Sequence, residues 1–432
     1  RKKILFTLLI VLVFRIGSVI PVPFLDMGAL NTLMKGVDDS GSMLSYLNTL
    51  SGGAFSNATL FAMGVTPYIN SSIILQLLCV AIPPLERMAK DGEVGRKKIG
   101  KITRYVTVIL GLVQGAAYFW YLYRSNVTVY KSGFDLVYSA IIIILVFTAG
   151  TALMMWMGEQ INNYGIGNGI SFIILIGIIA RFPDALIQEV VSRVANKSGG
   201  LIMFIIEVVF LLLVIGAAIL LVQGVRKIPV QYAKRIVGNK QYGGARQYIP
   251  LKVNAAGVMP IIFAQAIMFI PITFIGFSNN VNNAGGFLHA FTDHTSFWYN
   301  FVFAVMIILF TYFYTAITIN PTQMAEDMKR NNGFIPGIKP GKKTAEYIDD
   351  IMSRITLPGS FFLALVAIMP AFAGIFGVQA GFAQFFGGTS LLILVGVVLD
   401  TLQQVESHLL MRHYDGLLKS GRIKGRAGVA AY

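Results

Sequence analysis

The chain has 432 residues, of which 55% are hydrophobic and only 13% are charged, and its formal net charge is +15. Soluble domains carry about 25% charged residues, so this composition excludes an ordinary soluble protein and indicates a membrane protein. The single cysteine, Cys79, excludes a disulfide framework and a cysteine-rich metal site.

Ten apolar runs follow one another along the chain, and each is close to the ~20 residues that a helix needs to cross a bilayer. They predict an all-α polytopic membrane protein with ten transmembrane helices. The first run leads into a Pro-containing segment, residues 20–23, and not into a small-residue cleavage site, which favours a retained helix over a signal peptide. The runs are Ile4–Val22, Val65–Ile82, Tyr105–Tyr123, Leu136–Met157, Ile170–Ile187, Leu201–Val222, Ala255–Phe277, Phe301–Ile319, Ile355–Phe376 and Ser390–Leu410.

The basic residues fall mainly in alternate gaps between these runs. Of the 35 Lys and Arg residues, 28 lie in the gaps of one side, in residues 1–3, 87–104, 226–252, 329–354 and 412–426. Cytoplasmic loops of membrane proteins collect Lys and Arg. We therefore expect both termini and these five segments to be cytoplasmic.

The gap between the first and second runs holds an unusual segment, residues 42–58, which is uncharged, rich in Gly and Ser and too short to cross the membrane. It is either an external loop with a surface helix or a short element that folds back into the centre of the protein. Irregular chain is tolerated at membrane depth only when it is buried in protein or lines a water-filled cavity. Pro67, followed by Asn70, Ser71 and Ser72, predicts a broken, cavity-lining second span.

The segment before the fifth run contains Gly165, Gly167 and Gly169, which predict a tight cytoplasmic turn. Asn168 is a suitable N-cap for a helix that begins near Ile170. The glycine spacing and the absence of a βαβ unit exclude a dinucleotide-binding fingerprint. Residues 337–344 likewise lack the spacing and the strand-to-helix context of a phosphate-binding loop.

Two cytoplasmic loops, Arg226–Lys252 and Asn320–Arg354, are longer than a simple connection requires. Basic loops beside a membrane can contact anionic lipid headgroups. Two such loops on one face suit docking to a nucleoprotein or to an acidic partner better. Lys339 occupies the tip of a turn framed by Pro and Gly, residues 336–341.

The sequence shows no catalytic constellation, no metal-ligand spacing around its four histidines and no cofactor motif. The polar residues in the runs are mostly neutral, among them Gln76, Gln114 and Gln265, whose default role is hydrogen bonding between helices. Asn254 fits this role less well, because it lies where a cytoplasmic loop enters a run. A secondary transporter of a small solute is the main alternative class. Such a carrier normally has ionisable groups near the midplane of the membrane, and a cluster of such groups would distinguish it from a channel. An intramembrane enzyme is a more distant alternative.

Seven segments, in order along the chain, resemble the SecY family, the central subunits of protein-conducting channels. Individually these patterns are common, but their order and spacing from the first run to the last are specific. Lys339 stands where many members of the family carry Arg. The segments are Phe14–Gly17 with Ile20–Pro23, Phe61–Ile69, Asp91–Lys98, Gly165–Ser171, Leu251–Pro260, Phe334–Gly341 and Gly387–Ile393.

The resemblance implies two inverted halves of five helices each, residues 1–198 and 199–432. A short plug helix would lie at about residues 42–60, and cytoplasmic loops at 223–254 and 320–355. The implied function is to pass unfolded secretory polypeptides across the bacterial plasma membrane and to release hydrophobic segments laterally into the bilayer. No enzymatic activity and no cofactor are implied.

The resemblance also assigns roles to individual residues and partners. The implied partners are membrane subunits similar to SecE and SecG, an ATPase motor of the SecA type, the ribosome, the lipid bilayer and the translocating preprotein with its signal sequence. The resemblance implies a pore ring of Val65, Ile69, Ile178, Ile262 and Ile393, and a plug that contains Ser51, Gly52, Gly53, Ala54, Phe55 and Ser56. It implies a lateral gate that contains Gln76, Gln114 and Asn254. It also implies a surface for docking cytoplasmic partners, with Arg235, Lys240, Arg246 and Lys339.

Overall fold

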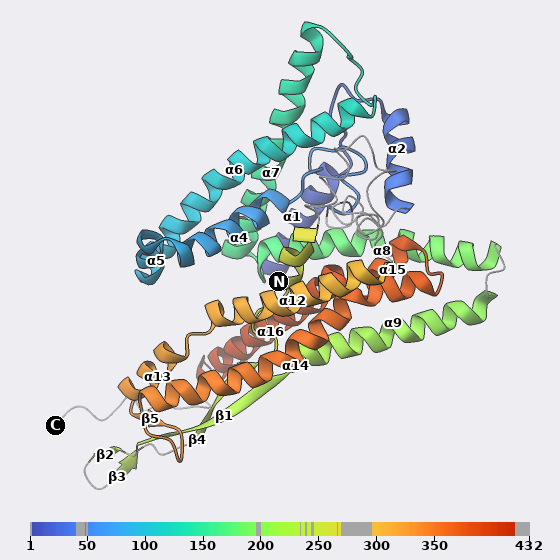
Figure 1. Cartoon of the computed structure of the whole chain (residues 1–432). Helices are drawn as coiled ribbons and strands as arrows, with labels where there is room; N and C mark the ends of the chain where they lie inside the picture. The colour runs from blue at the N-terminus through green and yellow to red at the C-terminus, as the bar shows by residue number, and fades with distance from the viewer. Residues whose placement is uncertain are drawn as a thin grey trace. The chain divides into compact units, whose positions relative to one another are not determined.

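The computed structural model of the chain is built mostly from helices (Figure 1). It describes residues 2–39, 48, 51–195, 200–233, 235–237, 240–242, 246–265, 267–268 and 296–419. The helices in these ranges are α1 (Lys2–Gly17), α2 (Met27–Asp39), α4 (Thr66–Ala81), α5 (Pro83–Lys90), α6 (Gly92–Arg124), α7 (Phe134–Tyr164), α8 (Gly169–Ala195), α9 (Gly200–Gln223), α12 (Phe297–Thr318), α13 (Pro321–Arg330), α14 (Lys342–Ile375), α15 (Ala380–Ala383), η2 (Gln384–Phe386) and α16 (Gly388–Lys419).

Within the described residues, seven helices are long and apolar enough to cross a membrane, and the bent pair α4–α5 makes an eighth candidate. The seven include α6, α7, α8, α9, α14 and α16, together with α12, which α13 extends. The predicted first span is the 16-residue α1. Of the predicted seventh span, residues 259–265 and 267–268 are helical, and residues 269–277 lie outside the described part. The chain is therefore a multi-pass helical membrane protein.

The second span differs from the prediction in the position of its break. Val65 precedes the first helical residue of α4, so Pro67 lies in the first turn, where a missing N–H is harmless. The helix then continues to Ala81, and the chain bends by 104° before α5. The prediction that Pro67 interrupts this span is wrong, because the break comes at Ile82, next to Pro83.

Ser71, which was expected to line a cavity, is instead fully buried between helices. Its hydroxyl lies 2.6 Å from Oγ1 of Thr107 and 3.4 Å from the carbonyl oxygen of Thr103. Ser71 therefore joins α4 to α6.

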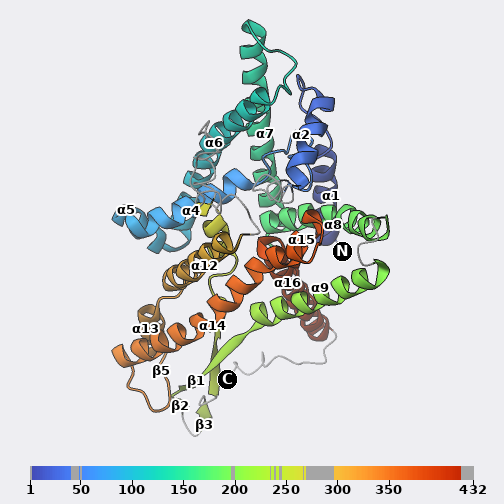
Figure 2. The ribbon, with the colours of Figure 1, turned by 45° about the vertical axis from the view of Figure 1, so that its right-hand side comes forward.

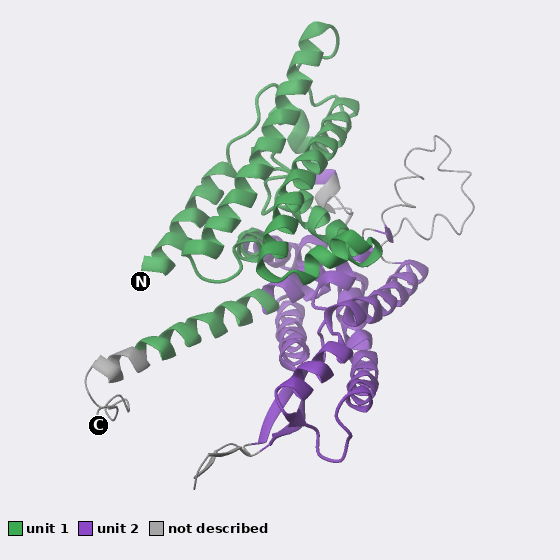
Figure 3. Ribbon diagram, turned by 90° about the vertical axis from the view of Figure 1, so that its left-hand side faces the viewer, with its two compact units in different colours: residues 1–34, 47–181, 396–432 green, residues 35–46, 182–395 purple. Residues whose placement is uncertain are grey.

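The chain forms two compact units (Figure 3). The first contains residues 1–34, 47–181 and 396–432, and the second contains residues 35–46 and 182–395. The division falls inside α8, between Arg181 and Phe182, just before the helix-internal Pro183. In the first unit α6 lies beside α7, and in the second α12 lies beside α14 (Figures 1 and 2).

The second unit also carries two small sheets, which the sequence analysis did not predict. A three-stranded antiparallel sheet has the order β4-β1-β5, with Ile228 of β1 opposite Ile249 of β4 and Gln231 of β1 opposite Phe334 of β5. The end of the β1–β4 hairpin is the pair β2 and β3. The strands are β1 (Val225–Tyr232), β2 (Arg235–Val237), β3 (Lys240–Tyr242), β4 (Arg246–Lys252) and β5 (Gly333–Phe334).

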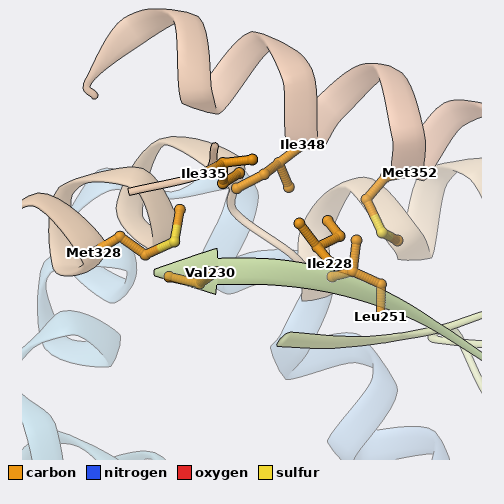
Figure 4. Packing of buried hydrophobic residues seen from close by; sticks show 7 residues of the cluster. All are labelled: Ile228, Val230, Leu251, Met328, Ile335, Ile348 and Met352. Atoms are coloured by element: carbon orange, nitrogen blue, oxygen red, sulfur yellow. The ribbon is translucent and has the colours of Figure 1, made fainter. Parts of the chain in front are cut away.

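One hydrophobic core joins the two long basic loops (Figure 4). The hairpin supplies Ile228, Val230 and Leu251, and its side chains pack against residues of α13, α14 and the segment between them. These partners are Met328, Ile335, Ile348 and Met352. Because their side chains share a core and their backbones share a sheet, the loops 226–252 and 320–354 form one folded body.

Candidate functional site

Residues 51–65, here called the central segment, run through the interior of the first unit as a succession of turns. Ala54, Ala58 and Thr59 are fully buried. This burial favours the folded-back reading of the segment over an external loop. The predicted plug residues Ser51 to Ser56 belong to this segment, whereas residues 42–47 and 49–50 of the predicted plug lie outside the described part.

The turns of the central segment satisfy their polar groups locally. The backbone N–H of Ser56 donates to Oδ1 of Asn48 at 3.0 Å, and the N–H of Gly53 donates to the Asn48 carbonyl at 2.9 Å. The hydroxyl oxygen of Ser51 accepts from the N–H of Phe55 at 3.1 Å. Buried irregular backbone must find such partners, because each unpaired group costs free energy.

Helices α6 and α7 hold one side of the central segment. The Tyr118 hydroxyl donates to the carbonyl of Phe55 at 2.7 Å, and the two rings stack with centroids 4.5 Å apart. Gly150 of α7 lies against the carbonyl of Leu60, where a Cβ atom would have no room. The segment is thus packed directly against backbone and aromatic rings.

Helices α1 and α8 hold the other side, at two glycines with left-handed backbone. Gly52 and Gly53 have φ values of +67° and +89°. A Cβ atom on Gly52 would lie 2.9 Å from Cα of Gly177 in α8, so only glycine fits this contact. From α1, Nη1 of Arg15 donates to the Gly52 carbonyl at 3.3 Å.

The five predicted pore-ring residues are divided between the two units. Val65, Ile69 and Ile178 belong to the first, and Ile262 and Ile393 to the second. Val65 and Ile69 lie one helical turn apart, since the Ile69 N–H donates to the Val65 carbonyl at 3.0 Å. Ile178 is fully buried next to Gly177, and Ile393 is also buried. Their meeting in a ring stays a prediction.

The predicted gate residues have unequal surroundings. Gln76 is exposed on α4. Oε1 of Gln114 and Oδ1 of Asn254 are buried, and neither finds a hydrogen-bond partner among the described residues. Gln76 and Gln114 lie in the first unit and Asn254 in the second. Their role as a gate also stays a prediction.

The predicted docking residues lie on the body formed by the two basic loops. Lys339 and Arg246 are exposed. The turn that carries Lys339 is fixed by Gly337 and Gly341, with φ values of +87° and +103°, and the Thr344 hydroxyl donates to the Lys339 carbonyl at 3.0 Å. Arg235 and Lys240 lie on β2 and β3 of the hairpin end, and their side chains lie outside the described part.

The tight turn before α8 is confirmed, as is the Asn168 cap. Oδ1 of Asn168 accepts from the N–H of Ser171 at 3.4 Å, and the N–H of Gly169 donates to Oδ1 of Asn162 at 2.7 Å. The turn also connects distant helices. The N–H of Gly167 donates to Oε1 of Gln404 in α16 at 2.9 Å, and that of Ile166 to the Thr7 hydroxyl at 3.3 Å.

A buried ionic cluster in the second unit was missed by the sequence analysis. Arg193 donates to Oε1 of Glu189 at 2.9 Å and to Oε1 of Glu207, and all three side chains are buried. The N–H of Gln379 donates to Oε2 of Glu189 at 2.9 Å. The spacing of four residues between Glu189 and Arg193 was an available signal.

Among the described residues no group of three potential metal ligands occurs.

Comparison with known proteins identifies the family. The sequence profile of the SecY family matches residues 59–402. The chain is 41% identical over 430 residues to the protein translocase subunit SecY of Streptomyces scabiei, covering 97% of both chains. The chain belongs to the SecY family. The corresponding subunit of Halalkalibacterium halodurans is 44% identical over 432 residues, again with 97% of both chains covered.

Solved structures of SecY-family and related channels share the fold. A structure described as a protein conducting channel matches with a TM-score of 0.62 and 16% identity, covering 94% of this chain and 92% of the other. A SecY structure, described as one whose plug domain stabilises the closed state and maintains a membrane seal, has a TM-score of 0.58, 16% identity and the same coverage. The channel of a canine ribosome–channel complex from the endoplasmic reticulum has a TM-score of 0.61 and 15% identity, also with 94% and 92% covered.

Proposed function

We propose that this chain is the protein-conducting subunit of a translocase, which passes unfolded secretory polypeptides across the plasma membrane and releases hydrophobic segments laterally into the bilayer. The observation that carries the proposal is the family match, which extends over 97% of the chain and of relatives named as protein translocase subunits. The buried, uncharged central segment supports it, because irregular backbone at membrane depth is tolerated only where it is buried in protein or lines a water-filled cavity.

The function is tested by reconstitution. Vesicles that contain the chain with its membrane subunits and a cytosolic ATPase motor should take up a preprotein with a signal sequence, and vesicles without the chain should not. Uptake of a small solute driven by an ion gradient, with no preprotein uptake, would overturn the proposal. A solute carrier is not favoured, because the Glu189–Arg193–Glu207 cluster lies toward the ends of α8 and α9 and not near the middle of a span.

In this proposal Val65, Ile69, Ile178, Ile262 and Ile393 form the constriction that a polypeptide passes. Aliphatic side chains give no specific contact to the passing chain, and a narrow apolar constriction excludes ions by dewetting. All five residues carry aliphatic side chains, which supports the assignment.

Replacement of Ile393 by Asn should wet the constriction and raise the ion conductance of reconstituted vesicles severalfold. Ile393→Val keeps an aliphatic surface and should leave the conductance near that of the wild type. Val398, which is 39% exposed on the same helix, provides a second control, and Val398→Asn should also have little effect. Equal conductance in Ile393→Asn and wild type would remove Ile393 from the ring.

Lateral release requires a gate that opens toward lipid, and we assign Gln76, Gln114 and Asn254 to it. The oxygens of Gln114 and Asn254 are buried and have no partner among the described residues, which supports this role, because such oxygens have the capacity to pair across a closed gate. Hydrogen bonds of this kind between membrane helices contribute only ~0.6 kcal/mol each. A leucine-rich signal gains about 0.3–0.6 kcal/mol per central residue in lipid, so it can displace such contacts.

We propose that the body formed by the two basic loops docks the cytosolic partner, either a motor of the SecA type or the ribosome, and that subunits similar to SecE and SecG lie beside the chain in the plasma membrane. The relative from the canine complex is described as ribosome-bound. Both termini are cytoplasmic in this proposal, because basic residues concentrate on that side.

Lys339→Glu should lower motor-driven translocation several-fold while the amount of inserted protein stays unchanged. The stiff turn presents this charge at a fixed place, so docking depends on its position and weakens with salt. Lys419→Glu, the same charge change at the end of α16, should have little effect. Equal defects in both variants, measured as preprotein uptake at matched protein amounts, would show that only net charge matters.

A further inference from the structure

Arg15 is the one charged residue inside the first apolar run, Ile4–Val22, and its surroundings are unusual for an arginine. No acidic side chain forms an ion pair with it within the described residues. The surface hollow next to it is lined by Leu12, Ile16, Val19, Ile20 and Pro21, all apolar. An arginine at membrane depth is costly and usually has a protein partner and a functional reason.

The protein partner of Arg15 is the backbone of the central segment. Its Nη1 donates to the carbonyl of Gly52 at 3.3 Å. This carbonyl belongs to the left-handed Gly52–Gly53 pair, which has no side chains by which a helix could hold it. A hydrogen bond from a charged donor to a carbonyl at low dielectric is stronger than a neutral one.

Gly52 and Gly53 are closely surrounded by α1 and α8, which leave little space around the contact with Arg15. A Cβ atom on Gly52 would lie 2.9 Å from Cα of Gly177 and 3.2 Å from Nη1 of Arg15. On Gly53 it would lie 3.6 Å from Cδ and Nη1 of Arg181. The glycine pair therefore lies between an arginine of α1 and the backbone and arginine of α8, and it can leave only by breaking the Arg15 contact.

We propose that Arg15 is a positioning residue that holds the central segment in place and thereby sets how readily the channel opens. The inference rests on the proposed function, because it concerns the segment assigned there to the plug. Displacement of the segment removes the Gly52 carbonyl from the guanidinium and leaves Arg15 beside the apolar hollow. The lost charged hydrogen bond opposes displacement, and a translocating chain has to compensate for it.

The test compares Arg15→Met with wild type and with Arg124→Met. Arg124 is exposed at the end of α6, so its replacement removes the same charge without touching the central segment. Arg15→Met should raise the basal ion leak of reconstituted vesicles about tenfold, the low end expected for a charged hydrogen bond of this length. It should also raise export of a preprotein whose signal has been shortened by several apolar residues. Arg124→Met should change neither.

The two readouts separate the proposal from its alternatives. A merely structural role of Arg15 would lower export of all preproteins and would not favour those with weak signals. If wild type exports nothing, the proposed function fails. If wild type exports its preprotein and the leak and weak-signal export of Arg15→Met equal those of wild type, the role of Arg15 is overturned. If Arg15→Met does not accumulate, Arg15→Gln removes the charge but keeps a polar side chain, and an unchanged leak in Arg15→Gln overturns the role equally.

Discussion

Arg193→Met should lower the free energy of unfolding by about 3–5 kcal/mol, the usual loss when one partner of a buried ion pair is removed. Glu189 is completely buried, and Arg193 and Glu207 are each 5% exposed, so the variant leaves two buried carboxylates without their cation. Thermal unfolding in detergent, followed by the loss of the monodisperse protein, measures the effect.

Two further variants make this prediction specific. Arg354→Met removes an exposed arginine that pairs with Asp350, and such surface pairs contribute about 0–1 kcal/mol. The combined replacement Glu189→Gln, Arg193→Met and Glu207→Gln removes every charge and should recover most of the loss, because neutral groups no longer need a counter-ion. Similar unfolding temperatures of Arg193→Met and Arg354→Met would contradict the contribution of the cluster to stability.

Gly169→Ala should destabilise the chain by about 1–3 kcal/mol or more, because it forces a methyl group into space that backbone atoms of α7 already occupy. A Cβ atom at this position would collide with the carbonyl oxygen of Gly158 in α7 and lie 2.8 Å from Cβ of Ile161. Neither atom belongs to a flexible side-chain end that could move away. The same thermal assay measures the loss, together with the yield of inserted protein.

Gly216→Ala is the matched control. Gly216 lies inside α9, and apart from its own stretch of helix no described residue lies within 4 Å of the place that a Cβ atom would take, so alanine there should stabilise the helix by up to about 1 kcal/mol. We therefore expect Gly169→Ala to lower the stability of the protein and Gly216→Ala to raise it. If Gly169→Ala leaves the thermal stability unchanged, the turn between α7 and α8 can widen without destabilising the protein.

The sequence predicted most of the spans because a helix that crosses lipid must be apolar over a fixed length, and this requirement leaves a direct pattern. It also predicted the Asn168 cap, which depends on a few adjacent residues. The break of the second span was misplaced because Pro67 stands in a first turn, where proline is tolerated, whereas Pro83 follows the actual bend. Proline alone does not tell these two positions apart.

The features that the sequence analysis missed depend on contacts between distant residues. β1 and β4 contain Pro229, Pro250 and several charged residues, so their alternation was obscured, and only their pairing and the core around Ile348 reveal them as strands of a sheet. Glu207 of α9 is brought to the Glu189–Arg193 pair of α8 by the approach of the two helices. The five ring residues, in contrast, were assigned by family resemblance alone, since each is an ordinary aliphatic residue in its own segment.

The sheet that joins the basic loops also has a mechanical consequence. β4 ends at Lys252, two residues before Asn254, and the N–H of Val253 donates to the Gly224 carbonyl at 2.9 Å. From this base the ladder of β1 and β4 extends to the pair Gln231–Arg246, and β5 leads from it to the Lys339 turn. Backbone hydrogen bonds thus connect the length of β1 and β4 directly to the start of the seventh apolar run. If a cytosolic partner docks on this body as proposed, a load at the outer end of the hairpin would act on the start of the seventh apolar run, where Asn254 lies.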